Sequence, residues 1–595
     1  MQIPGSKIER FVRGLVEQCT QSQMARITRG GMYRNYYLLG SDNPDGPAMY
    51  NKCFAYLDDL ESLLYSPVSL AFHIGDPDEP NALNIAKGRA AAARLGTLAR
   101  RSSTDTMMSE AVCWSLVKGK AFVKMKWSRG QLAPDLVQSE LMGVAQENLT
   151  RLDEDMEFFV HSTYITKYQF ARMVWNHPDK AELLKKIKRY TKPGREGRSP
   201  DLDATAKQII VGGLYPYQSA DSPTPNKTRG IVDWMGNPSP QLSPEMLSEL
   251  IRLDEVWAWD DARQDWATFQ IVGDDMLIMG RYRTINAFAY NPASKEEWPE
   301  LKGHHPFVEF CPNRIDGYFW GRSEICNVAL LQEAINSRLA GINRMLRKQE
   351  DPPTKFIGSS GVNQNALARL RKPGGYYTDS NPNAKVEDMT PQIPGDLWES
   401  LAEYERMFDE MGGLPPIAKG RGESGVRSQG HAETLVRMFS PRFKDRALLV
   451  ERDVEACGSL MLDLAEAHDP KVLTAWLPQA YAGMEADPQA NPFLIPPAPG
   501  LVPVRFELAD LDDDMSVTVN SHSSSPAFAA EARALSFDLY KIGAMDQQDV
   551  IESVDAPNAA ELIAGVQRRG AEKAAQIAKL EPAEQLKLLE GGKKK

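Results

Sequence analysis

Residues 395–430 read GDLWESLAEYERMFDEMGGLPPIAKGRGESGVRSQG, and this stretch decides the fold. Its first half, 395–411, has apolar residues at helical spacing and predicts an amphipathic helix with a strongly acidic polar face. Its predicted apolar stripe is Leu397, Leu401, Tyr404, Phe408 and Met411. Its second half, 412–430, contains six glycines and four charged residues: Lys419, Arg421, Glu423 and Arg427. A segment so rich in glycine and charge predicts a cationic loop suited to the backbone of an anionic polymer.

Two phosphate-binding motifs nearly fit this loop. Gly420, Gly422 and Gly425 spell GxGxxG, but a dinucleotide site needs a strand that ends at the first glycine. Here a predicted helix and a pair of prolines come first. The spacing from Gly425 onward also matches a P-loop, yet His431 stands where the phosphate-binding lysine belongs. The P-loop is therefore excluded, and a nucleotide-binding enzyme that uses residues 420–425 remains the alternative function.

A second amphipathic helix is predicted over residues 325–349, where apolar residues recur at steps of three and four until two prolines end the pattern. Its predicted apolar stripe is Val328, Leu331, Ile335, Leu339, Ile342 and Leu346. The charged residues of this helix sum to +3, whereas those of 395–411 sum to −5. The charges that could pair between such helices are Arg338, Arg344, Arg347 and Lys348 on the first, and Glu399, Glu403 and Glu405 on the second. The intervening residues 350–394 are rich in Pro, Gly, Asn and Tyr, so we expect a two-helix hairpin with a small module at its tip. The alternative interpretation is that both charged faces are merely solvated.

The rest of the chain is mixed α and β. A helix of about 28 residues is predicted to begin at Ser440-Pro441 and to end near His468, with an apolar stripe that runs from Phe443 to Leu464. Residues 81–118 predict long helices that Gly119 ends, and 121–127 predicts a strand. The run from Glu255 to Thr284 predicts an antiparallel meander whose Trp residues form core. Residues 191–245 are rich in Pro, Gly and Ser and predict a surface excursion or linker.

Composition limits the chemistry. The 595-residue chain carries a net charge of −11, so it cannot simply coat nucleic acid, and any contact with DNA must be local or transient. Its six cysteines form no CxxC pair, its histidines form no HExxH, and its Asp pairs fall at predicted turns. We therefore expect no catalytic residue, no metal and no cofactor. No apolar run is long enough for a membrane span, and the N-terminus does not resemble a signal peptide.

The order of these elements resembles that of the portal proteins of tailed bacteriophages, from about residue 110 onward. The motifs that carry the resemblance are GKAFVK at 119–124, similar to the family's turn into a wing strand, and GYFWGRSEICNVALLQEAINSRL at 317–339, similar to the start of its first stem helix. The resemblance implies an α+β portal fold. Its parts would be the wing (1–324 and 431–521, the latter with the long helix), stem helices (325–349 and 395–411), clip (350–394), tunnel loop (412–430) and helical crown (522–595). The segment 191–245 departs from the minimal pattern.

The same resemblance implies a function. Portal proteins form a ring, usually of twelve subunits, at one capsid vertex, and conduct double-stranded DNA during packaging and ejection. The packaging ATPase (the terminase large subunit) and later the head-tail adaptor and tail proteins dock on the clip. Twelve chains would carry a net charge of about −130, and such a repulsive wall lets DNA slide. The implied location is the virion, with synthesis in the host cytoplasm.

The clip and the tunnel loop contain the predicted contact residues. Lys419, Arg421 and Arg427 would touch DNA from the tunnel loop. Residues 350–394 are too few to bury a large core alone, so their apolar side chains would be covered by neighbouring subunits, terminase or adaptor. These side chains are Phe356, Ile357, Leu367, Leu370, Tyr376 and Tyr377. Another head-tail ring adaptor is a further alternative, although adaptors are usually much shorter chains.

Overall fold

The computed structural model shows a mixed α+β protein with two compact units, as the sequence predicts for the fold class. Unit 1 comprises residues 1–34, 57–324 and 437–595, and unit 2 comprises 35–56 and 325–436. The structure describes residues 8–42, 50–65, 72–75, 82–128, 130–152, 156–165, 167–174, 180–190, 251–261, 265–272, 276–282, 305–350, 354–357, 381–383, 385–388, 394–413, 441–469, 471–478, 501–511, 515–519, 535–543, 547 and 550–551.

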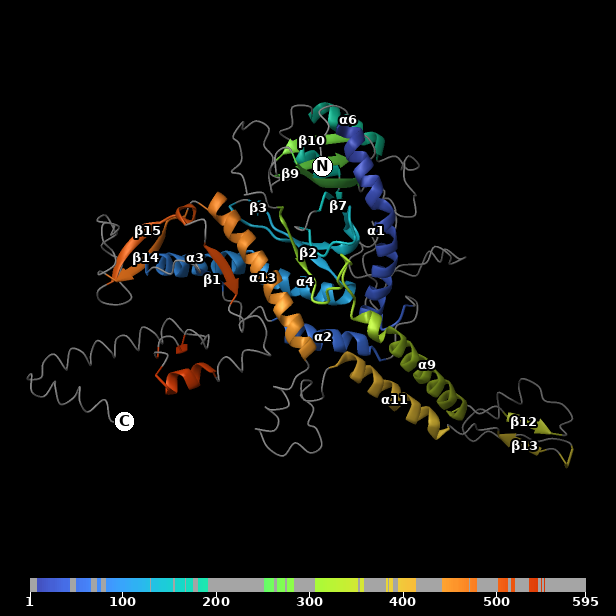
Figure 1. Cartoon of the computed structure of the whole chain (residues 1–595). Coiled ribbons are helices and arrows are strands. Elements are labelled where there is room, and N and C mark those ends of the chain that lie inside the picture. Colours follow the sequence, from blue (N-terminus) through green and yellow to red (C-terminus); the bar gives the residue numbers. More distant parts are fainter. Residues whose placement is uncertain are drawn as a thin grey trace, which may run out of the picture. The chain divides into compact units, whose positions relative to one another are not determined.

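The centre of unit 1 is a five-stranded antiparallel sheet with the strand order β10-β9-β8-β7-β6 (Figure 1). The predicted meander is confirmed as three of these strands, β8, β9 and β10. The strands span Met142–Val144 (β6), Phe158–Ile165 (β7), Ile251–Asp260 (β8), Asp265–Val272 (β9) and Met276–Tyr282 (β10). Two short helices, α5 (Lys167–Met173) and α6 (Lys180–Tyr190), follow β7.

Both faces of the five-stranded sheet are buried. Alternate side chains of its strands point to opposite sides, so each strand contributes to two cores. On one face, Val12 and Val16 of helix α1 (Ile8–Leu39) pack with Val160, Val256 and Phe269. On the other face, a second core forms between this sheet and a three-stranded sheet of order β11-β2-β5. That sheet contains β2 (Ala121–Lys124), β5 (Asp135–Gln138) and β11 (Phe307–Phe310). Helix, sheet and sheet therefore form three layers.

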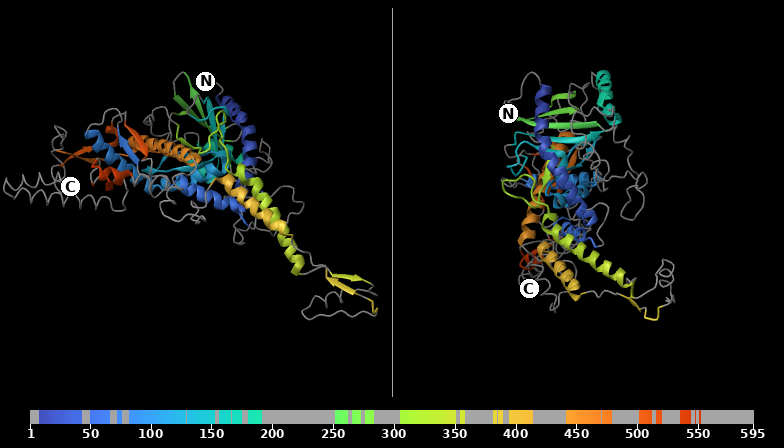
Figure 2. Two further views of the ribbon diagram at one scale, coloured as in Figure 1. Left: turned by 60° about the horizontal axis from the view of Figure 1, so that its bottom comes forward. Right: turned by 90° about the vertical axis from the view of Figure 1, so that its right-hand side faces the viewer.

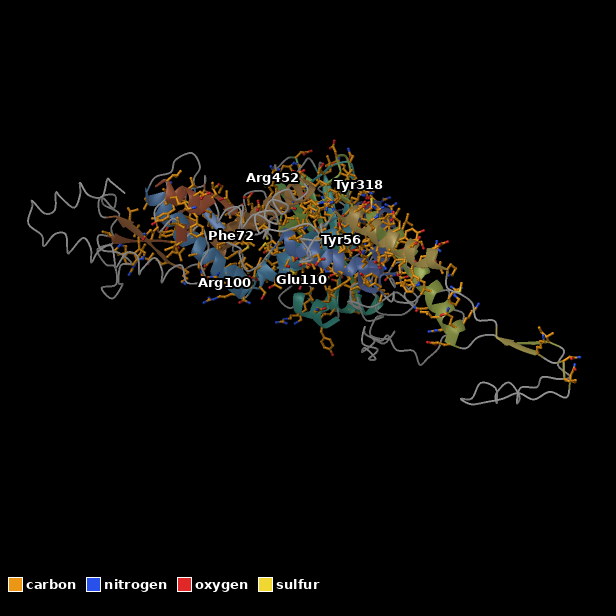
Figure 3. All side chains as sticks on the ribbon, turned by 90° about the horizontal axis from the view of Figure 1, so that it is seen from below. Tyr56, Phe72, Arg100, Glu110, Tyr318 and Arg452 are labelled. Carbon is orange, nitrogen blue, oxygen red and sulfur yellow. The ribbon has the colours of Figure 1, made fainter. Side chains whose placement is uncertain are left out.

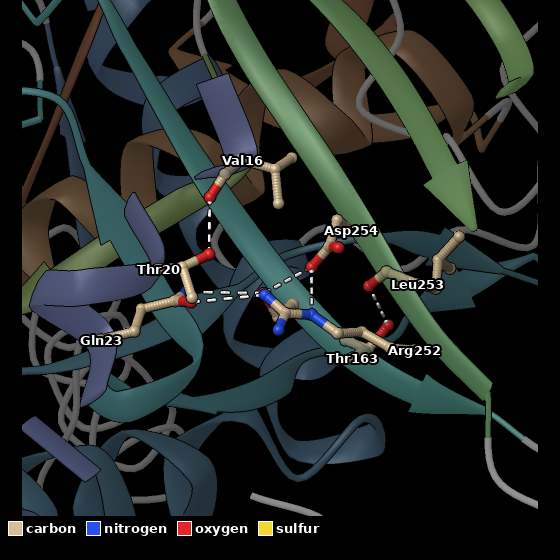
Figure 4. A network of polar contacts seen from close by, with 8 residues as sticks. Val16, Thr20, Gln23, Thr163, Arg252, Leu253 and Asp254 are labelled. Carbon is tan, nitrogen blue, oxygen red and sulfur yellow. Dashed lines mark hydrogen bonds and ion pairs between the residues drawn. The ribbon is translucent and has the colours of Figure 1, made fainter. Parts of the chain in front are cut away.

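A polar network fixes α1 on its sheet (Figure 4). The guanidinium of Arg252 donates to Asp254 (Nε to Oδ1, 2.8 Å) and to Ser162 (Nη2 to Oγ, 3.1 Å). It also reaches the amide oxygen of Gln23 on α1 at 3.4 Å. Because Asp254 is buried, its pairing with Arg252 offsets the cost of removing the charge from water.

Between the two sheets lies a buried ion pair. The Lys124 ammonium is 2.5 Å from Oε2 of Glu255, and the indole N–H of Trp257 donates to the other carboxylate oxygen at 2.8 Å. Burial by itself raises the pKa of Glu255, but the neighbouring Lys124 and His161 outweigh it and lower that pKa to about 2. The predicted strand 121–127 is thus confirmed in its first four residues, and Lys124 points inward from it.

The second half of unit 1 is built on three helices. Helix α3 (Ala82–Arg101) and helix α4 (Thr104–Lys118) confirm the prediction for 81–118, and Gly119 ends α4 with φ +98°. Helix α13 (Pro441–His468) confirms the predicted long helix, and its predicted apolar stripe, Phe443 to Leu464, is buried. Small antiparallel pairs complete this part. They are β1 (Phe72–Gly75) with β16 (Ser516–Val519), β14 (Leu473–Pro478) with β15 (Leu501–Phe506), and β3 (Trp127–Ser128) with β4 (Gln131–Leu132).

Unit 2 contains a helical hairpin (Figure 2). Helices α9 (Ile325–Glu350) and α11 (Gly395–Gly412) pack against each other, and helix α2 (Lys52–Leu64) begins in the same unit. Between α9 and α11 the chain forms two antiparallel strands, β12 (Thr354–Ile357) and β13 (Lys385–Asp388). The predicted two-helix hairpin is therefore confirmed, whereas most of the predicted module 350–394 lies outside the described residues. Among the described residues no helix is both long and apolar enough to cross a membrane.

Candidate functional site

The α9–α11 hairpin carries the charged and apolar residues that the sequence singles out as an interaction site. Val328, Ile335 and Ile342 of α9 are buried, as are Leu401 and Phe408 of α11. These residues belong to the predicted stripes, so periodicity located the packed faces. The stripes end differently from the prediction, because Leu346 is exposed and Met411 is 53% exposed. Each helix thus leaves apolar surface outside the packed face.

The N-terminal segment 35–56 is part of this unit, which the sequence did not predict. It is tied to α9 by two amide side chains, Gln332 and Asn336, which lie four residues apart. The backbone N–H of Lys52 donates to Oε1 of Gln332 at 3.0 Å, and Nε2 of Gln332 donates to Tyr50 O at 2.8 Å. Nδ2 of Asn336 donates to Gly40 O at 2.8 Å. In the sequence, the only sign of this contact is that two amide side chains, Gln332 and Asn336, lie one turn apart in helix α9.

Lys52 extends the same connection to α11. Its ammonium donates to the backbone carbonyl of Glu405 at 2.9 Å and lies 3.1 Å from the carboxylate of Asp409. The aliphatic part of the side chain is buried, and the ammonium lies 5.1 Å from the ring centre of Phe408. A charged group held this way joins both helices of the hairpin to one segment, and it fixes how they lie against each other.

We predict that Gln332→Ala lowers the free energy of unfolding of unit 2 by roughly 1–3 kcal/mol, because it removes the hydrogen bonds of the Gln332 side chain to the buried N–H of Lys52 and to the carbonyl of Tyr50. Gln332 is 0% exposed, so water cannot replace the amide. Denaturant unfolding measures the loss, and hydrogen exchange at the Lys52 amide locates it. Ser337→Ala, at an exposed position of the same helix, is the control. Unchanged exchange at Lys52 in the Gln332 variant would contradict the predicted role.

The junction between α11 and the glycine-rich loop is closely defined. Gly413 has φ +71°, and its N–H donates to Asp409 O and Glu410 O, which ends the helix. At Gly412 a Cβ atom would lie 2.9 Å from the ring of Tyr56, and the Tyr56 hydroxyl donates to Gly412 O at 3.1 Å. Tyr56 is labelled in Figure 3. The Tyr56 ring therefore leaves no room for a side chain at position 412, and the positive φ favours glycine at position 413. The predicted DNA-contacting residues Lys419, Arg421 and Arg427 lie outside the described residues.

Of the charged residues predicted to lie between subunits, some contact other side chains of the same chain and some do not. The Arg338 guanidinium lies 5.9 Å from the ring centre of Tyr404 on α11, so part of it is engaged inside the hairpin. Glu403 pairs with Arg406 at 2.6 Å on its own helix. Within the described part of the chain, the other predicted charges form no ion pair. They are Arg344, Arg347 and Lys348, which are exposed, Glu399, which is exposed, and Glu405, which is partly buried.

Helix α11 also exposes large apolar side chains next to its acids. Trp398 is 50% exposed, and Met407 and Met411 lie one turn apart on another side of the helix. Isolated exposed apolar residues are ordinary, but several on one charged helix make α11 a candidate interaction surface. Met411 belongs to the predicted apolar stripe of α11 but is exposed, and Trp398 lies outside that stripe.

The tip of the hairpin is described only at its base. Phe356 of β12 is the register partner of Val386 in β13, and Ile357 is 38% exposed opposite Lys385. The antiparallel pair fits the small module predicted for 350–394. The other predicted partner-binding residues, Leu367, Leu370, Tyr376 and Tyr377, lie outside the described residues, as do most of the predicted crown and all of segment 191–245.

Titratable groups in the core of unit 1 are held in structural contacts. Asp453 of α13 accepts from the Cys311 N–H at 3.0 Å and lies 2.6 Å from the Arg314 guanidinium. Burial raises the pKa of Asp453 to about 7, against the opposing effect of Arg314. Burial also raises the pKa of the Cys19 and Cys311 thiols to about 12, which leaves them protonated and unreactive near neutral pH. In the described ranges no group of three His, Cys, Asp or Glu side chains could hold a metal ion.

Comparison with known proteins gives likenesses in structure only. No family model matches the sequence, and no curated protein matches it. Among solved structures, a chain of "Virion of native gene transfer agent (GTA) particle" has 10% sequence identity and a TM-score of 0.38, and the match covers 89% of this chain and 93% of that chain. A chain of "Neck of empty GTA particle computed with C6 symmetry" has 10% identity and a TM-score of 0.37, covering 84% and 89%. TM-scores below 0.5 do not establish a shared fold.

Proposed function

We propose that this chain is a portal protein that forms a ring at one capsid vertex and conducts double-stranded DNA. One observation carries the proposal: a two-helix hairpin with a β-strand pair at its tip is followed, through the fixed glycines at 412–413, by a cationic glycine-rich loop and the long helix α13. In this assignment α9 and α11 are the stem helices, the β12–β13 region is the clip, and residues 412–430 form the tunnel loop.

The hairpin supports ring formation because its two helices carry opposite charge on exposed surface. Arg344, Arg347 and Lys348 at the end of α9 suit Glu399 and Glu405 on α11 of a neighbouring copy. Trp398 and Met411 add apolar area beside those charges. In a ring every copy uses one surface to bind the next and another to be bound, so a single chain can present both signs. The proposed partners are therefore the chain itself, the capsid protein, the terminase large subunit, the head-tail adaptor and tail proteins, and DNA.

Negative-stain electron microscopy of the purified protein tests the proposal directly. We expect closed rings, twelve subunits being the family's usual number, with a central channel. Calorimetry with ATP and NAD tests the alternative of a nucleotide-binding enzyme, because the portal function requires neither ligand. Compact particles without a channel, together with stoichiometric nucleotide binding, would replace the proposal by that alternative.

Reversal of Glu399, Glu403 and Glu405 to Lys is expected to reduce the assembled fraction several-fold. The effect should be larger at about 0.05 M than at about 0.5 M salt, since salt screens the new repulsion from α9 of the next copy. Light scattering after size-exclusion chromatography measures the fraction. Reversal of Glu9, Asp58 and Glu110, which are exposed in unit 1, makes the same change in net charge and should leave assembly intact. Equal assembly of both variants at each salt concentration would refute charge pairing between stem helices.

A further inference from the structure

Helix α3 has a charge pattern unlike that of the chain around it. Its 20 residues include Lys87, Arg89, Arg94, Arg100 and Arg101 and no acid, which gives +5 in a chain of net charge −11. Arg94 is committed, because its guanidinium lies 2.7 Å from the carboxylate of Asp469 and both side chains are nearly buried. Arg100 and Arg101 are exposed, and so is Arg89, which also makes a contact within the chain. Figure 3 labels Arg100 on this helix.

The opposite side of α3 is packed and unavailable. Ala91, Leu95 and Leu98 are buried, and α3 contacts β1, β14 and α13 (Figure 1). At Gly88 the helix lies so close to β1 that an added Cβ atom would collide with the carbonyl oxygen of Ile74. A helix whose apolar side is buried in this way cannot insert that side into a lipid surface. The basic side is therefore what α3 offers to a partner.

Small residues separate the arginines on the exposed side of α3. Arg89 and Arg100 are 11 positions apart, or about 16 Å along the helix axis. Ala93, Gly96 and Thr97 lie between them on this side, and all three have small side chains. Among the described residues of α3, the exposed large apolar side chain is Ile85, one turn before Arg89. Protein interfaces usually centre on several aromatic or aliphatic anchors, so one isoleucine beside a row of cations favours an anionic partner instead.

We propose that the Arg89–Arg100–Arg101 face of α3 binds the phosphate backbone of double-stranded DNA without regard to sequence. Arginine forms two parallel hydrogen bonds to phosphate oxygens, and small residues between arginines let the duplex approach the helix. The contact is distinct from the tunnel loop, which lies in another part of the chain. It depends on neither ring formation nor the portal assignment.

Fluorescence anisotropy of the full chain with a labelled random-sequence duplex tests the proposal over a range of salt concentrations. R89Q/R100Q/R101Q is expected to weaken binding about tenfold or more at low salt and to reduce the slope of log K against log salt by about two to three, because each phosphate contact releases counterions. R10Q/R29Q/R452Q removes three exposed cations from other helices and should change affinity less than about twofold.

A charge-conserving variant separates binding from folding damage. R89K/R100K/R101K should keep most of the affinity and the salt slope, because lysine still meets phosphate as a point charge. Equal losses in the lysine and glutamine triples would overturn the proposal, as would equal losses in the glutamine triple and the control triple. So would tighter arginine-dependent binding to polyglutamate or to anionic phosphatidylserine vesicles than to duplex DNA, which would identify an acidic protein or a membrane instead.

Discussion

A chain in which residues 358–384 are replaced by Asn-Gly is expected to form rings and to package no DNA. Ile357 and Lys385 are register partners at the open end of the antiparallel pair β12–β13, and Asn-Gly is the two-residue turn that closes such a pair. The replacement therefore removes Leu367, Leu370, Tyr376 and Tyr377 without disturbing the strands. Under the proposed function these apolar residues are covered by neighbouring subunits, terminase or adaptor, and we expect the loss of the terminase contact to prevent the motor from docking on the shortened tip. DNase-protected DNA in a packaging reaction with procapsids and terminase is the measurement.

Two controls define what the loss means. A second variant fills the positions 358–384 with a Gly/Ser sequence of equal length, and it should fail as the Asn-Gly chain does, because the apolar side chains are missing from both. Electron microscopy of each variant checks that rings still form. Packaging at the wild-type level by the Asn-Gly chain would remove the clip assignment while leaving the ring itself intact.

The elements of this protein could be predicted from the sequence wherever one periodicity governs a long run. Helices α9, α11 and α13 begin and end within about a residue of the expected positions, since Pro and Gly mark their ends. The meander β8–β10 follows from short aromatic and β-branched runs separated by turn residues. Gly119 ends α4 as expected because only glycine adopts its positive φ without strain.

Contacts between distant segments could not be predicted in the same way. Nothing local in residues 35–56 indicates that Lys52 binds α11 or that Gln332 receives its backbone N–H. The buried pair of Lys124 with Glu255 joins residues 131 positions apart, and a lysine in a strand is normally assigned to the exposed face. Pairings of this kind depend on which sheets stack, and composition and period do not contain that information.

For the candidate site, the charged residues could be identified from the sequence, but the contacts that they make within the chain could not. It treated Arg338 and Glu403 as available for a neighbouring subunit, whereas the structure places Arg338 beside Tyr404 and pairs Glu403 with Arg406. Both pairs are partly exposed and cost little to open, so they can still exchange partners on assembly. Arg344, Arg347, Lys348 and Glu399 are exposed, and they could pair with a neighbouring subunit without first giving up such a contact.

Neutralising Lys419, Arg421 and Arg427 to Gln is expected to leave rings intact and to reduce the retention of packaged DNA on the order of tenfold. The three substitutions follow the end of helix α11 in the sequence, and that end is fixed by Tyr56 and by the hydrogen bonds of Gly413. Repeated around a ring, three cations per chain form a collar that meets phosphates weakly and without sequence preference. Removing them takes away the attraction but none of the contacts between subunits. DNase-resistant DNA that remains in filled heads after a salt challenge measures retention.

Charge and flexibility of the loop can be tested separately. Replacing Gly420, Gly422 and Gly425 by Val keeps all three cations but stiffens the backbone, and it should impair retention to a comparable degree while rings persist. R10Q/R29Q/R452Q, which removes three exposed cations from unit 1, should retain DNA as the wild type does. If the glutamine triple retains DNA normally, or if a map of the ring shows Lys419, Arg421 and Arg427 turned away from the channel axis, the loop is not the DNA contact and the collar must be abandoned.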